Sequence, residues 1–141
     1  MGRQHPNKKN LRRIKVQSSL ESNKKIVKEF YDILCNKKDF ESASHYIGNQ
    51  YIQHNPTVAD GPEGLPAFVD LLKSDFKGSR VEIKRIFADG DYVIVHVHGT
   101  CPNKPDLAIM DIFKLENGKI VEHWDVIQPI PETSLNSNGM F

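Results

Sequence analysis

The second half of the chain alternates apolar and polar residues with a period of two. The alternation occupies four consecutive segments, residues 81–86, 92–101, 107–115 and 120–127. A period of two places successive side chains on opposite faces of a β-strand. Asp89-Gly90 and Asn117-Gly118 are typical two-residue hairpin turns, and such short connections join antiparallel neighbours. The sequence therefore predicts a four-stranded antiparallel meander.

The first half of the chain shows helical spacing instead. Apolar residues recur every three or four positions in three segments, residues 22–34, 40–46 and 61–76. Between the last two, residues 51–55 are aromatic and β-branched and precede a proline, which predicts a short strand. Helices followed by a meander predict an α+β domain, in which N-terminal helices pack over a curved antiparallel sheet.

The boundaries of this domain are predicted at residues 22 and 131. Residues 1–21 are basic and rich in polar residues, so we expect a disordered N-terminal tail. Residues 132–141 hold Ser, Asn and Gly and are expected to form a flexible C-terminal tail. At 141 residues, of which 38% are hydrophobic, the chain has the size and composition of one globular domain.

The charge is unevenly distributed. Residues 1–19 carry six Lys or Arg and no Asp or Glu, which leaves 13 basic and 18 acidic residues in the rest of the chain. The folded part therefore carries a negative net charge. Binding to nucleic acid requires positive charge, so no nucleic-acid partner is expected. No apolar run approaches the ~20 residues of a membrane span, and no secretory signal begins the sequence. We expect a cytoplasmic protein with no membrane partner.

Cysteine and histidine patterns give little support for a metal. Cys35 and Cys101 are far apart and lack CxxC spacing, so both are expected to be reduced thiols. His96 and His98 form a single HxH pair, for which His54 is the nearest candidate third ligand. This pattern is a weak zinc signal, and we expect no metal.

The turn at Asn117-Gly118 predicts which residues meet across the last hairpin. With these two residues in the turn, Asp111 faces Trp124, and Ile109 and Phe113 flank Asp111 on the same side of the sheet. A carboxylate among apolar side chains is costly to bury unless it is paired or protonated. The presence of an aspartate at position 111, on an apolar strand face, therefore requires an explanation.

The preceding hairpin offers a partner for this carboxyl group. If a four-residue turn joins Cys101 to Asp106, His96 faces Asp111 and His98 faces Ile109. One interpretation is a pocket under the helices, where desolvation suits the carboxyl group for proton transfer and His96 shares its proton. The alternatives are a structural His–Asp pair, or an Asp111 that points to solvent. Trp124 fits a core position or a pocket wall equally well, and His54 fits a loop anchor or a substrate contact.

Several segments together resemble a known family. They are Tyr51-Ile-Gln-His-Asn-Pro56, Ala59-Asp-Gly61, Asp111-Ile-Phe-Lys114 and Asn117-Gly-Lys-Ile-Val-Glu-His-Trp-Asp125. The chain, from about residue 23 to residue 131, resembles the SnoaL-like polyketide cyclases of the nuclear transport factor 2-like superfamily. It is most similar to the branch that catalyses aldol condensation. The resemblance implies a cone-shaped α+β fold that encloses a pocket.

The resemblance also implies a chemistry. Its general acid/base is an aspartate in a pocket without cofactor or metal, which acts on a carbon next to a carbonyl; Asp111 matches that aspartate, and His96 fits a second catalytic group. The expected substrate-binding residues are Tyr51, Gln53, His54, Asn55, His98, Ile109, Phe113 and Trp124. A small-molecule substrate and a homodimer are implied as well. Two alternatives remain open at this point, a non-catalytic ligand-binding or dimerisation module and a metal-dependent hydrolase.

Overall fold

The computed structural model describes residues 7–141. Within this range the chain forms three α-helices, one π-helical turn and five strands. Their bounds in chain order are α1 Lys8–Tyr31, η1 Asp32–Asn36, α2 Phe40–Ser44, β1 Ile47–Gln53, α3 Gly64–Ser74, β2 Arg80–Asp89, β3 Tyr92–Thr100, β4 Leu107–Glu116 and β5 Lys119–Pro129. The predicted order of helices and strands is confirmed.

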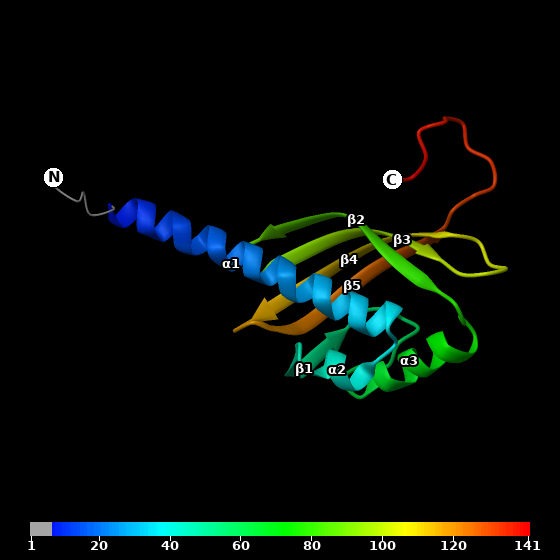
Figure 1. The fold of residues 1–141 in the computed structure, drawn as a ribbon, viewed down its shortest axis with the longest axis horizontal. Helices are drawn as coiled ribbons and strands as arrows, with labels where there is room; N and C mark the ends of the chain where they lie inside the picture. The colour runs from blue at the N-terminus through cyan, green and yellow to red at the C-terminus, as the bar shows by residue number, and fades with distance from the viewer. Residues whose placement is uncertain (1–6) are drawn as a thin grey trace.

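The five strands form one curved, unclosed sheet with the order β1-β5-β4-β3-β2 (Figure 1). Strands β2 to β5 form the predicted antiparallel meander. Strand β1 adds to the edge of β5 in a parallel direction, so the sheet is mixed. The parallel pairing was not predicted, because the partner of an isolated short strand depends on tertiary packing.

The second half of α1 lies across the concave face of the sheet (Figure 1). Its buried face consists of Val27, Phe30 and Tyr31, and Leu34 of η1 continues it. These side chains pack on inward-facing residues of the strands, including Val93, Val95, Val97, Phe113, Leu115 and Ile120. Helix α3 and the short α2 lie beside η1 and β1 at the same end of the domain, as Figure 1 shows. The helices thus cover one face of the sheet, as predicted.

The prediction of a disordered tail over residues 1–21 is wrong for its described part. Helix α1 begins at Lys8, capped by Asn7, whose side chain accepts a hydrogen bond from the backbone N–H of Lys9 at 3.2 Å. The segment 8–22 contains no Gly or Pro, and the docked half of α1 supplies the nucleus from which the helix extends. Its residues are exposed nearly throughout, and this part of α1 projects beyond the sheet (Figure 1). Residues 1–6 lie outside the described range.

The end of the chain folds back toward the sheet. Residues 132–141 form neither helix nor strand. The ring of Phe141 nevertheless stacks on His98 of β3, with 4.5 Å between the ring centroids. No helix in the part of the chain that the structure describes has the length and apolar character to span a membrane.

Candidate active site

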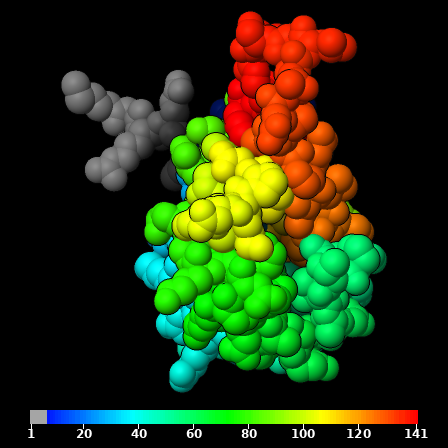
Figure 2. Space-filling model, turned by 90° about the vertical axis from the view of Figure 1, so that its right-hand side faces the viewer, coloured from blue at the N-terminus to red at the C-terminus, as the bar shows by residue number. Residues whose placement is uncertain are grey.

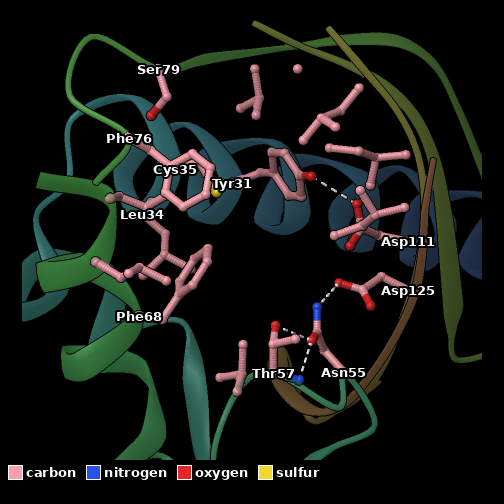
Figure 3. Close-up of a pocket in the computed structure, with 18 of the residues that line it drawn as sticks. Tyr31, Leu34, Cys35, Asn55, Thr57, Phe68, Phe76, Ser79, Asp111 and Asp125 are labelled. Carbon is pink, nitrogen blue, oxygen red and sulfur yellow. Dashed lines mark hydrogen bonds between the residues drawn. The ribbon is translucent and has the colours of Figure 1, made fainter. Parts of the chain in front are cut away.

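A cavity of about 410 Å³ lies between the concave face of the sheet and the helices. Most of its lining is apolar, contributed by residues of α1, η1, α3 and the strands. Figure 3 shows Leu34, Phe68 and Phe76 on one side of this cavity and Asp111 and Asp125 on the other. The volume lies within the range of small-molecule sites, and an apolar wall with few polar groups is typical of them. The cavity therefore has an apolar end and a polar end.

Three segments lie at the end of the molecule that faces the viewer in Figure 2, beside the end of β5 and the residues after it. They are α3 with the residues after it, the loop that joins β3 to β4, and the segment that follows β1. All three contribute to the cavity lining, through Phe76, Lys104 and Thr57 respectively. The ammonium of Lys104 lies 4.7 Å from the centroid of the Phe76 ring. This end of the domain is thus built from α3 and two loops, whereas Asp111 and Asp125 at the polar end of the cavity lie on strands β4 and β5.

Asp111 is the most deeply buried carboxylate of the cavity, with 3% of its surface exposed. Its Oδ2 accepts a hydrogen bond from the Tyr31 hydroxyl at 2.7 Å (Figure 3). Its Oδ1 lies 2.8 Å from Nε2 of His123. The carboxyl group predicted from the strand pattern is therefore inside the cavity, where two partners offset the cost of its burial.

The partner of Asp111 is His123, not Trp124, because a β-bulge shifts the last hairpin. Leu115 faces Ile120 as predicted, but the register shifts between Lys114 and Leu115. Beyond the bulge, Asp111 faces Asp125 and Phe113 faces His123. One extra residue in a strand moves its side chains to the opposite face. The predicted pairing of Asp111 with Trp124 is wrong for this reason.

His96 lies on the face of the sheet away from the cavity, so its predicted contact with Asp111 is also wrong. Asp111 faces Val95 across the β3–β4 pair, and His96 faces Met110. The loop between β3 and β4 fixes a register that differs by one residue from the predicted one. Nδ1 of His96 instead lies 2.7 Å from a guanidinium nitrogen of Arg85.

Three predicted substrate-binding residues are likewise outside the cavity lining. Nε2 of His98 pairs with Oδ2 of Asp106 at 2.8 Å. The rings of His54 and Trp124 stack on each other at 4.8 Å, and Nε2 of His54 lies 2.9 Å from Glu122. The contacts of these three side chains lie outside the cavity, and none of the three lines it. The other five predicted residues do line it: Tyr51, Gln53, Asn55, Ile109 and Phe113.

Three polar residues close to Asp111 were not predicted as site residues: Tyr31, His123 and Asp125. Without the bulge, His123 and Asp125 would lie on the face of the sheet opposite to Asp111. The hydroxyl of Tyr31, on α1, reaches Asp111 across 80 positions of sequence. The one available signal was the His-x-Asp spacing, which places both side chains on one strand face.

The side-chain amide of Asn55, which is itself held by Thr57, orients the carboxylate of Asp125. Nδ2 of Asn55 donates to Oδ2 of Asp125 at 2.7 Å, as Figure 3 shows. Oδ1 of Asn55 accepts from the backbone N–H and the hydroxyl of Thr57, at 2.8 Å and 2.7 Å. Because a backbone N–H only donates, this contact fixes which end of the Asn55 amide faces Asp125.

Burial sets the direction of the pKa shifts in the cavity. Desolvation raises the pKa of Asp125 above that of a free aspartate, although the Asn55 hydrogen bond and His123 oppose the shift. Desolvation, together with the charge of Asp111, raises the pKa of Tyr31. Burial likewise raises the pKa of the Cys35 thiol. Tyr31 is therefore a hydrogen-bond donor and Cys35 a neutral thiol at physiological pH.

Asp111, His123 and Asp125 also place their polar atoms within 4.8 Å of one another. One imidazole and two carboxylates form a donor set that divalent transition metals accept. In this structure, however, Nε2 of His123 is directed at Oδ1 of Asp111, and Oδ2 of Asp125 is directed at Asn55. These hydrogen bonds leave no buried side-chain polar atom among the described residues without a partner.

Comparisons with solved structures support the fold. TsrD from Streptomyces laurentii superimposes with a TM-score of 0.66 at 20% identity, over 76% of this chain and 88% of that chain. An LEH-like epoxide hydrolase from M. tuberculosis gives a TM-score of 0.63 at 18% identity, over 78% of this chain and 85% of that one. An NTF2-like protein of unknown function from Cytophaga hutchinsonii gives 0.61 at 18% identity, over 76% and 90%.

Sequence comparison identifies the family. Among curated proteins, none matches this chain. The family model for SnoaL-like polyketide cyclases matches residues 25–131, which include every strand and the polar end of the cavity. The match covers well over half of the chain and agrees with the NTF2-like architecture of the solved structures. The chain therefore belongs to the SnoaL-like polyketide cyclase family.

Proposed function

We propose that the protein is an enzyme that moves a proton on a carbon next to a carbonyl, with Asp111 as the general base. The observation that carries this proposal is the position of Asp111. Its carboxyl group is buried at the polar end of an otherwise apolar cavity, within hydrogen-bond distance of a histidine and a tyrosine. A carboxyl group in such surroundings is suited to general acid/base catalysis.

The proposed reaction begins when a carboxylate oxygen of Asp111 takes a proton from the α carbon. The C–H bond breaks, and its electron pair moves into an enolate whose charge rests on the carbonyl oxygen. The enolate carbon then either takes a proton back, which gives an isomerase, or attacks a second carbonyl group. In the second case a C–C bond forms, and the new alkoxide takes the proton from Asp111, which completes an aldol addition.

The substrate class follows from the lining. An apolar wall with a single polar end suits a small, largely apolar carbonyl compound whose acidic carbon lies near Asp111. Exclusion of water by this wall strengthens electrostatic interactions at the polar end. The proposed sequence of steps draws on the side chains of the cavity and on no added group.

Hydrogen exchange tests this proposal without knowledge of the natural substrate. A panel of aryl ketones and β-keto esters is incubated with the protein in D₂O, and replacement of the α hydrogens is followed by NMR. We expect exchange with at least one apolar member, and a loss of about 100-fold or more for Asp111→Asn. The matched control is Asp106→Asn, which changes a carboxylate outside the cavity that pairs with His98.

Two outcomes would count against catalysis. Exchange that continues unchanged in Asp111→Asn would remove Asp111 from the reaction. Binding of panel members without any exchange would favour the second candidate function, a ligand-binding module, for which the apolar cavity alone would suffice.

A further inference from the structure

We propose that Gln53 is a positioning residue that keeps a hydrogen on Nδ1 of His123 and thereby directs Nε2 toward Asp111. Oε1 of Gln53 lies 2.7 Å from Nδ1 of His123, on the side of the ring away from Asp111. Gln53 thus acts on Asp111 through His123. The contribution of Gln53 to catalysis rests on the proposed function, whereas the presence of a hydrogen on Nδ1 of His123 does not.

The orientation of the Gln53 amide is fixed by the backbone. Its Oε1 also accepts a hydrogen bond from the backbone N–H of Asn55 at 3.0 Å. A backbone N–H only donates, so the amide atom that faces it is the oxygen and not the nitrogen. The same oxygen faces Nδ1 of His123. Because an amide oxygen only accepts, Nδ1 must carry the hydrogen of that contact.

This arrangement determines what happens on the other side of the ring. With a hydrogen on Nδ1, a neutral His123 presents the lone pair of Nε2 to Asp111, 2.8 Å from Oδ1. Two lone pairs facing each other at that distance repel. One proton must therefore lie between the two atoms, as an imidazolium with a carboxylate or as an imidazole with a carboxylic acid. The pair holds one mobile proton, and Asp111 is available as a base when that proton lies on His123.

The fold brings Gln53 to this position. Gln53 is the last residue of β1 and pairs with His123 in the parallel β1–β5 register. The backbone N–H of Gln53 donates to Oδ1 of Asp60 at 2.9 Å, and the next N–H, of His54, donates to the carbonyl of His123 at 3.0 Å. The bond from His54 holds the end of β1 against β5, and the bond from Gln53 ties it to the loop that follows β1.

No other group near His123 takes this role. The rings of Tyr51 and Phe113 flank the imidazole, with centroids 6.3 Å and 4.9 Å away. Asp125 is the second carboxylate beside the ring, and its Oδ2 lies 3.9 Å from Nε2, on the Asp111 side. Among the described residues, Gln53 is thus the hydrogen-bond partner of Nδ1.

Nitrogen NMR tests this inference on the whole protein without a ligand. Long-range ¹H–¹⁵N correlation of ¹⁵N-labelled protein reports which imidazole nitrogen carries hydrogen, and His123→Gln assigns the His123 signals. In the wild type we expect a protonated Nδ1. Gln53→Glu keeps an oxygen acceptor and should keep this pattern. Gln53→Met removes the acceptor and should shift His123 toward the form with hydrogen on Nε2 alone.

The matched control is Gln50→Met, an exposed residue on the same strand, which should leave the His123 signals unchanged. An unprotonated Nδ1 in the wild type would overturn the inference, whether or not any variant folds. So would a Gln53→Met protein with the wild-type pattern.

Kinetics separate this inference from the proposed function. On a carbon acid that the wild type exchanges, Gln53→Met should lower kcat by at least about tenfold with little change in KM, and Gln53→Glu should restore the rate in large part. If Nδ1 of His123 is protonated but the protein exchanges no α hydrogen of any compound in the panel, the inferred hydrogen position is supported and the proposed reaction is refuted. An unchanged kcat in Gln53→Met would refute the catalytic role of Gln53.

Discussion

The imidazole of His123 reaches Asp111 diagonally across β4 and β5, with 2.8 Å between Nε2 and Oδ1. In the strand register, Asp111 stands opposite Asp125, and His123 stands opposite Phe113. Diagonal neighbours on one face of an antiparallel pair lie within reach of long side chains. The bulge near the hairpin turn places all three polar side chains on the concave face, under α1.

The hydroxyl of Tyr31 should contribute measurably to stability. Tyr31→Phe leaves Oδ2 of Asp111 buried without its 2.7 Å donor, and we expect a loss of about 1–3 kcal/mol in the free energy of unfolding. Urea denaturation measures this loss. Tyr46→Phe is the matched control, because the Tyr46 hydroxyl bonds the partly exposed Glu29, and it should cost less than about 1 kcal/mol. Equal losses in the two variants would contradict the buried contact.

Asp125 should oppose folding at neutral pH. Burial raises its pKa in the folded protein above the unfolded value near 3.8, so the folded state binds more protons between the two values. The contribution of Asp125 to the free energy of unfolding is therefore fully present at a pH below its pKa in the unfolded chain. It is lost as the pH rises through its pKa in the folded protein. Asp125→Asn removes the charge while its amide oxygen can still accept from Asn55.

We accordingly expect Asp125→Asn to have a higher urea midpoint than the wild type at pH 7, and the difference to shrink at pH 3.5. Asp89→Asn, at an exposed position, is the control and should show no such dependence. A lower midpoint for Asp125→Asn at pH 7 would show that its ionised carboxylate stabilises the fold.

Much of the fold follows from local signals in the sequence, whereas the site depends on register. The turn at Asn117-Gly118 and the period-two pattern predict the last hairpin, and Asp39 caps α2 through the backbone N–H of Ser42. Alternation also identifies Asp111 as a carboxyl group on an apolar strand face. Its partner could not be predicted, because a bulge of one residue exchanges Trp124 for His123 and leaves no mark in the hydrophobic pattern.

The outer face of the sheet is the surface on which we expect a homodimer. It carries large exposed apolar side chains on adjacent strands, namely Phe87, Tyr92, Met110 and Val126. Met110 and Val126 are paired across β4 and β5, and 72% of the Val126 surface is exposed. Exposed apolar patches of this kind mark association surfaces.

Sedimentation velocity tests the dimer. We predict a dimeric wild type and a monomeric Val126→Asp. Leu135→Asp, in the segment after β5 that lies outside the sheet, should remain dimeric. A wild type that sediments as a monomer at all concentrations would contradict the prediction.

The most direct measurement of the role of Asp111 is the stereochemistry of α-hydrogen exchange. A base that belongs to one wall of a cavity reaches a bound methylene group from one side. For a ketone that the wild type exchanges in D₂O, NMR distinguishes the two prochiral hydrogens of the α carbon. We predict that deuterium replaces only one of them, and that Asp111→Asn abolishes this replacement. Equal replacement of both hydrogens, or selective exchange that survives in Asp111→Asn, would contradict the account.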